Sequence, residues 1–246
     1  MPAFAALMIA VATLVVITRG QHNQEREPSN LGVTSVKEGV MTEMQRRHSK
    51  LYENRRSRKL GDRSNATELV VTTPWGDDDA YKTFDEFLRV SACSADAVVV
   101  GTVKNNISQL TADGTFIFTD SEIALEDVLK NTAGAKIEPA NPLLITRPGG
   151  AVELNGTLLR VTDRSFKPLQ INGRYLFFLR FVAATGAYQQ LNGKSAFQLR
   201  ENRISKLTEE EFSFPFAAAE ISPTALVVLV RTIGTHCENN QKRGVK

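Results

Sequence analysis

The sequence predicts a mainly β fold, a small antiparallel barrel with flanking helices, preceded by an N-terminal apolar helix and a basic helical linker. Three observations predict it. Short stretches rich in β-branched and aromatic residues recur between residues 97 and 199, separated by turn residues. No helical pattern of about 10–15 residues lies between them, which argues against a parallel α/β sheet. With 42% hydrophobic and 23% charged residues, the 246-residue chain can bury a core.

The N-terminal helix is predicted from residues 3–18, whose only polar side chains are two threonines. As a helix this run is about 25 Å long, close to the minimum that spans a bilayer. No Lys or Arg precedes it, and it ends in Ile17-Thr18-Arg19-Gly20 without a clear cleavage site. Residues 1–18 are therefore interpreted as an uncleaved membrane anchor. A cleaved signal peptide and a buried soluble helix are the alternatives.

Two opposing signals bear on the side of the membrane that the body occupies. Arg19, Arg26 and Lys37 follow the apolar run, and by the positive-inside rule they would keep the body in the cytoplasm. Cys93 and Cys237, one at each edge of the predicted body, argue for export, because an even number of cysteines behind such a segment suggests a disulfide. We therefore expect a Cys93–Cys237 disulfide and a membrane-anchored or secreted, extracytoplasmic protein. Two unrelated buried thiols are the alternative.

Residues 19–76 are predicted to form a basic linker that is helical over residues 35–60. Between Met44 and Arg63 there are eight Lys or Arg residues and two acidic ones. This pattern is typical of a solvated helix or stalk, and it also fits binding to anionic lipid head groups or nucleic acid. From residue 64 onward, nineteen basic residues face twenty-one acidic ones, so the body lacks the positive charge that nucleic-acid binders use.

The folded body is predicted to span residues 77–237 and to begin with a helix. Asp77-Asp78-Asp79 precede apolar residues with helical spacing, Tyr81, Phe84, Phe87 and Leu88, and acidic residues favour a helix start. Strands are then predicted at residues 97–103, 116–129, 143–146, 151–159, 175–181, 187–191 and 196–199.

A closing helix ends the predicted body. Ser222 is its expected cap, Pro223 lies in its first turn and residues 225–233 are its apolar part. Residues 238–246 are predicted to be a polar tail.

Two of the predicted strand regions also predict how their strands are connected or where they lie in the sheet. Asn155-Gly156, within residues 151–159, is a two-residue hairpin signal. In residues 175–181, apolar side chains alternate on both faces, Tyr175, Phe177 and Leu179 on one and Leu176 and Phe178 on the other, which indicates a central strand. Six to eight strands of uneven length fit a partly open, OB-like barrel best, with a two-sheet sandwich second.

Four segments of the body carry a resemblance to known proteins. They are Cys93–Gly101, Phe118–Lys130, Arg147-Pro148-Gly149-Gly150 and Gly173–Leu179. Together they resemble an uncharacterised family of bacterial exported β-rich proteins over about residues 83–207. The spacing is also similar to that of netrin-like and TIMP-like OB barrels, although those inhibitors use a free N-terminal cysteine and Cys93 is internal. The resemblance implies a β-rich fold and export, and it implies no catalytic residues.

Catalytic, metal-binding and cofactor-binding motifs are not found in the sequence. The three histidines, His22, His48 and His236, lie outside the predicted barrel, which argues against a Ser-His-Asp or Cys-His site within it. Carboxylates such as Glu126 and Asp127 leave a glycosidase-like pair open, because pairing of distant acids in space is invisible in sequence.

These observations favour a membrane-tethered, extracytoplasmic OB-like interaction module over an enzyme. Its expected partner is a protein or a glycan, with contact to the membrane through residues 3–18 and no cofactor. The alternative is a nucleic-acid-binding OB-like protein that uses the basic residues 44–63.

Overall fold

The computed structural model describes residues 34–35, 41–55, 59–60, 68–72, 81–132, 137–214, 216 and 221–244. The predicted membrane anchor (1–18) and the acidic run at residues 77–79 lie outside these ranges. Among the helices that the structure describes, none is both long enough and apolar enough to cross a membrane.

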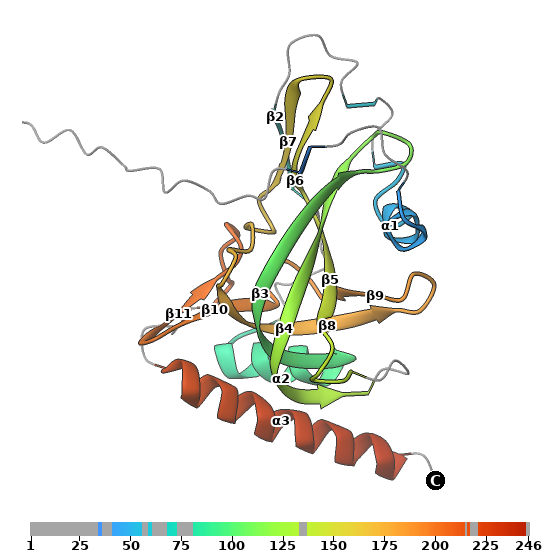
Figure 1. Ribbon diagram of the computed structural model, residues 1–246. Coiled ribbons are helices and arrows are strands. Elements are labelled where there is room, and N and C mark those ends of the chain that lie inside the picture. The colour runs from blue at the N-terminus through green and yellow to red at the C-terminus, as the bar shows by residue number, and fades with distance from the viewer. Residues whose placement is uncertain are drawn as a thin grey trace, which may run out of the picture.

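The described part of the chain is mainly β, with two sheets and flanking helices (Figure 1). The larger sheet has the order β11-β10-β8-β3-β4-β5-β9, and a further pairing of β8 with β9 brings its end back to its middle. Five strands, β3, β4, β5, β9 and β8, therefore close a ring. Its neighbouring strands are antiparallel except for β5 and β9. The strands of this sheet are β3 (Ala97–Leu110), β4 (Ile117–Asn131), β5 (Leu143–Pro148), β8 (Arg174–Val182), β9 (Ala187–Gln190), β10 (Ala196–Arg200) and β11 (Arg203–Lys206).

The smaller sheet, of order β1-β6-β7-β2, lies at one end of the ring, and helices α2 and α3 lie at the other (Figure 1). Its strands are β1 (Thr34–Ser35), β2 (Glu68–Val71), β6 (Gly150–Leu154) and β7 (Thr157–Asp163). The predicted hairpin is confirmed: Asn155 and Gly156 join β6 to β7, and both have positive φ, 52° and 74°. This is the conformation that a two-residue turn between twisted strands requires.

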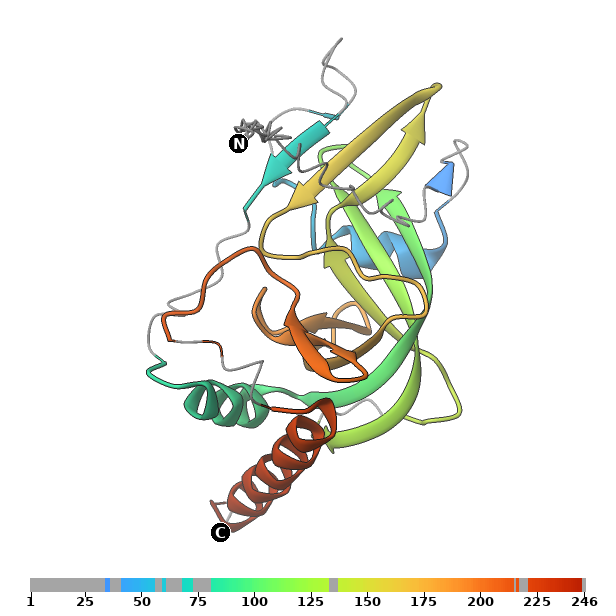
Figure 2. The same cartoon turned by 90° about the vertical axis from the view of Figure 1, so that its left-hand side faces the viewer.

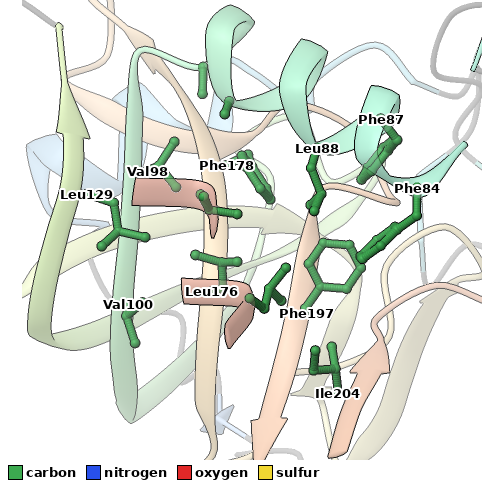
Figure 3. Packing of buried hydrophobic residues seen from close by; sticks show 14 of the residues in the cluster. Phe84, Phe87, Leu88, Val98, Val100, Leu129, Leu176, Phe178, Phe197 and Ile204 are labelled. Carbon is green, nitrogen blue, oxygen red and sulfur yellow. The ribbon is translucent and has the colours of Figure 1, made fainter. Parts of the chain in front are cut away.

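Helix α2 (Phe84–Ser94) packs on the outer surface of the ring, as Figure 3 shows. Thr83 caps its first turn by accepting a hydrogen bond from the backbone N–H of Glu86. Phe84, Phe87 and Leu88 point from the helix toward the strands. There they meet a buried cluster that includes Val98, Val100, Leu176, Phe178, Phe197 and Ile204.

The prediction that the strand at residues 175–181 is central is confirmed. Strand β8 pairs with β3, β9 and β10, and its side chains are buried on both faces from Tyr175 to Leu179. Tyr175, Phe177 and Leu179 belong to the cluster inside the ring, whereas Leu176 and Phe178 belong to the cluster under the helices. One strand therefore joins the two largest parts of the core.

Helix α3 (Pro223–Gly244) begins as predicted and ends later than predicted. The Ser222 side chain accepts a hydrogen bond from the backbone N–H of Ala225, which confirms the cap. Residues 238–244, the first part of the predicted polar tail, continue the helix. No proline or glycine occurs in the helix between Gly234 and Gly244, so nothing in the sequence ends it earlier.

The predicted disulfide is present in the structure and fastens α3 to α2. Cys93, in the last turn of α2, is bonded to Cys237 in α3, with Cα atoms 5.3 Å apart. Both cysteines of the chain are used in this bond. Next to it, the buried Lys130 of β4 donates from Nζ to the backbone carbonyls of Ala92, Cys93 and Ala95, at 2.7–2.8 Å. A cation therefore satisfies the carbonyl groups that the end of α2 leaves unpaired.

Described residues of the predicted linker, residues 19–76, pack against the body. Within residues 35–60, the described residues form one helix, α1 (Glu43–Ser49), and a later strand, β2, pairs with β7. Figure 2 shows β2 beside the hairpin and α1 beside the long strands of the ring. His48, Ser49 and Tyr52 are buried there. The boundary predicted at residue 76 thus divides elements that pack together. The side chains that bury His48 and Tyr52 belong to strands that come much later in the chain.

A hydrogen-bonded carboxylate, Asp113, joins the turn between β3 and β4 to the end of this helical segment. It accepts hydrogen bonds from the Asn54 backbone N–H and from Thr111 and Thr115. Burial alone would raise the pKa of Asp113, but these hydrogen bonds outweigh it, and the pKa falls from 3.8 to about 2.

We expect Asp113 to make stability depend on acid pH. Since its pKa is lower in the folded state, its contribution is present above about pH 4 and is lost as the pH falls to about 2. Urea unfolding of the wild type should therefore lose more free energy between about pH 5 and about pH 2 than that of Asp113→Asn. If the free energy of unfolding falls by the same amount in both proteins over this pH range, Asp113 contributes nothing to acid sensitivity.

Candidate functional site

The ring interior becomes polar where it meets the smaller sheet. Val103 and Ile123 are apolar, whereas further along the same strands come the pairs Asn106–Ser121 and Ser108–Thr119. A cavity of about 40 Å³ lies at this end, with these four polar residues along one wall. A single water molecule needs about 10–15 Å³ on this scale, so the cavity holds more than one water or a small chemical group.

The polar wall of the cavity is hydrogen-bonded within itself. Ser121 donates to the Asn106 side-chain oxygen at 2.7 Å, and Asn106 in turn donates to the Leu169 carbonyl at 2.8 Å. Ser108 and Thr119 are 2.9 Å apart, and Thr119 donates to the Gly149 carbonyl at 2.7 Å. These bonds fix the wall, and they leave its side chains few donors for a ligand.

Arg147, unlike the polar side chains of the wall, still has hydrogen-bond donors to offer a ligand. It is the last inward-facing residue of β5 after Leu143 and Ile145, and only 4% of it is exposed. Its Nη1 donates to the Lys167 carbonyl at 2.9 Å, and its guanidinium lies 5.3 Å from the centre of the Phe166 ring. Its Nε and Nη2 are buried and have no hydrogen-bond partner among the described residues. A buried donor left unpaired costs about 1–3 kcal/mol, so these two groups need an explanation.

The positively charged guanidinium of Arg147 is buried away from solvent. Burial lowers the pKa of Arg147 to about 10, so the side chain remains a cation at neutral pH. Asp163 also lines the cavity and is buried, and its charge partly offsets that of Arg147. One Asp163 carboxylate oxygen accepts the Ser165 backbone N–H at 3.0 Å.

The segment Gly149-Gly150 forms the corner that closes the cavity. Its residues have φ of 89° and 141°, in a region that other residues rarely adopt. A Cβ atom on Gly150 would lie 2.5 Å from the side-chain oxygens of both Ser108 and Thr119. The two glycines therefore allow the backbone to turn from β5 into β6 directly against the polar wall.

A second hollow, of about 250 Å³, lies on the outer face of the ring beside α1, between Met44, Ile107 and Leu144. Its main buried polar group is Asp120, whose two carboxylate oxygens each lie 3.0 Å from Nδ1 of the buried His48. His48 lies in α1, outside the ring as predicted, and packs against the outer face of the ring. The His48–Asp120 contact joins residues 72 positions apart, and because its groups already have partners it is a weaker candidate than Arg147.

Other residues singled out from the sequence do not converge on a site. Glu126 binds Thr102 and Arg174, at 2.7 and 2.6 Å, and Asp127 pairs with Arg231, so these two carboxylates do not form a catalytic pair. In the described ranges, no three His, Cys, Asp or Glu side chains gather as metal ligands would.

The basic segment proposed for nucleic acid is partly engaged within the protein. Arg46 and Arg47 both pair with Glu43, and the Arg55 guanidinium lies 5.0 Å from the centre of the Tyr52 ring. Other basic residues of this segment, at positions 56, 58 and 63, lie outside the described ranges.

Comparison with known proteins places this chain in no family. No protein-family model matches it, and neither does any curated protein. The resemblances drawn from its segments remain predictions, and the function has to be argued from the residues themselves.

Sequence reasoning missed the Arg147 site, because it ended the predicted strand at residue 146, whereas β5 continues to Pro148. One signal was present in the sequence. Leu143, Ile145 and Arg147 alternate on one face of a strand, which places a cation in the inward series. The wall opposite it could not be inferred, because it depends on the register of β3 against β4.

Proposed function

We propose that this protein is a non-enzymatic binding module that acts outside the cytoplasm, tethered to the membrane by residues 3–18. Its body would be an OB-like barrel. The closed ring of five strands supports this view, as does its single parallel contact, between the third and the fifth strand of the ring in chain order.

The binding role rests on the cavity at the end of the ring. Ligand sites occur preferentially in the mouths of β-barrels, where a few polar groups converge beside apolar side chains. Here the buried guanidinium of Arg147, beside Phe166 and Leu169, has two donors that no described residue pairs. Unpaired buried donors destabilise the protein, and a ligand that accepted their hydrogen bonds would remove this cost.

The compartment rests on the Cys93–Cys237 disulfide. Disulfides persist in oxidising compartments and are rare in the cytosol. The bond closes a loop of 144 residues and holds a helix against the body, which is a structural role rather than a transient one.

Reporter fusions in bacterial cells test the location. Alkaline phosphatase joined after Lys246 of the full chain should be active, because it folds only outside the cytoplasm, and a cytoplasmic fluorescent reporter at the same position should be dark. The same fusions to a chain lacking residues 3–18 are the control and should give the reverse pattern. A silent phosphatase with a bright reporter on the full chain would place the body in the cytoplasm and refute the proposal.

A further inference from the structure

We propose that the cavity at the end of the ring binds a carboxylate group, held side-on by Nε and Nη2 of Arg147. The inference rests on the proposed binding function and names the chemical class of its ligand.

The geometry of the guanidinium selects a planar anion. Nε–H and one N–H of Nη2 lie parallel on the same edge of the guanidinium, and their spacing matches the two oxygens of a carboxylate. These are the two nitrogens for which the described part of the chain supplies no partner, whereas Nη1, on the other side, donates to the Lys167 carbonyl. The protein thus uses one donor of Arg147 to fix the side chain and leaves the bidentate edge unused.

The size and lining of the cavity limit the rest of the ligand. About 40 Å³ is room for the carboxylate head and not for a sugar ring. Phe166, Leu169 and Val161 border the same space, so the atoms next to the carboxylate should be apolar. A carboxylate that ends a short apolar group meets both conditions, either as a free small acid or as the C-terminus of a peptide.

Asp163 should lower the affinity of the cavity for every anion and favour monoanions over divalent ones. Its carboxylate lines the cavity and partly balances Arg147, so a divalent or bulky anion such as phosphate would be repelled more than a monoanion. The second arginine of the lining, Arg160 of β7, is half-buried and adds positive potential to the cavity.

The test compares propionate with its neutral analogue propionamide on the purified, disulfide-intact full chain in neutral detergent. At constant ionic strength, propionate should raise the melting temperature progressively with concentration, and propionamide should leave it unchanged. The tripeptide Ala-Ala-Ala with a free or an amidated C-terminus forms the second arm. Tighter binding of the free peptide identifies a chain end as the ligand, and tighter binding of propionate identifies a small acid.

Arg147→Lys keeps the charge and removes the bidentate edge, so it should weaken binding at least about tenfold. Arg174→Lys is the matched control, because Arg174 pairs with Glu126 and does not line the cavity; binding should be unchanged. Equal binding of acid and amide, no binding of either, or full binding by Arg147→Lys would each overturn the proposal.

One readout needs no variant. Pro148-Gly149 is the only Pro-Gly pair in the chain, so labelling proline with ¹³C at the carbonyl and glycine with ¹⁵N isolates the Gly149 N–H signal. Gly149 lines the cavity, and its signal should move with propionate and stay with propionamide. A signal that stays fixed with both would overturn the carboxylate site. The titration does not depend on the compartment, so it can fail or succeed separately from the reporter fusions.

Discussion

Replacing Phe178 with Asp should abolish folding of the body. Phe178 is fully buried in the central strand β8, within the cluster that α2 and α3 cover. The change removes a large apolar side chain, which alone costs about 3–5 kcal/mol, and buries a carboxylate without a partner, which costs several more. Domains are stable by only about 5–15 kcal/mol. Circular dichroism and thermal melting should therefore show no cooperative transition.

Arg180→Asp is the matched control for this prediction. Arg180 lies two residues further along the same strand and is exposed, so the same new side chain there meets water. We expect this variant to melt within a few degrees of the wild type. A Phe178→Asp protein that melts as cooperatively as the control would mean that this side chain lies outside the core.

Loss of the Cys93–Cys237 disulfide should be the second largest effect. The bond joins residues 144 positions apart, and the chain-entropy model then gives a stabilisation of about 5 kcal/mol, of which about 2–5 kcal/mol is typically observed. Cys93→Ser, Cys237→Ser and the double variant should lose the same amount in urea unfolding, because each removes the same bond. Reduced wild type should match them.

Thiol titration is the direct check on this bond. The wild type, denatured without reductant, should show no free thiol, and two thiols after reduction, since both cysteines of the chain are paired. Two free thiols before reduction would contradict the disulfide and remove the main support for export. If the two single variants lost different amounts of unfolding free energy, the cysteine side chains would stabilise the protein by packing rather than by the disulfide.

Much of the fold could be predicted from local pattern. The alternation of apolar residues gave four strands of the ring within about two residues, because burial on one or both faces leaves a period of two in the chain. The exception is β3, which continues to Leu110, past the predicted end at residue 103. Asn155-Gly156 gave the hairpin, since two consecutive positive φ angles need such residues. Ser222 and Pro223 gave the start of α3 for an equally local reason, the unpaired N–H groups of a first turn.

The errors of the sequence-based prediction have a common cause in contacts between distant residues. Helix α1 was taken for part of a solvated linker because the surface that buries His48 and Tyr52 lies about 70 residues further along the chain. Strand β11, too, was missed. Its four residues, Arg203–Lys206, have a weak pattern, and their pairing with β10 defines the strand.

Local periodicity and the count of a single residue type were enough to predict the mainly β class, the central strand, the closing helix and the pairing of the two cysteines. The surroundings of each charged side chain, in contrast, depend on how distant strands pack. Lys130 lies beside three carbonyls at the end of α2, Asp120 lies beside His48, and Arg147 lies in a cavity where two of its donors have no partner among the residues that the structure describes. The cost of a buried charge depends on its partners, and the register of the strands places those partners, so no single stretch of the chain contains that information.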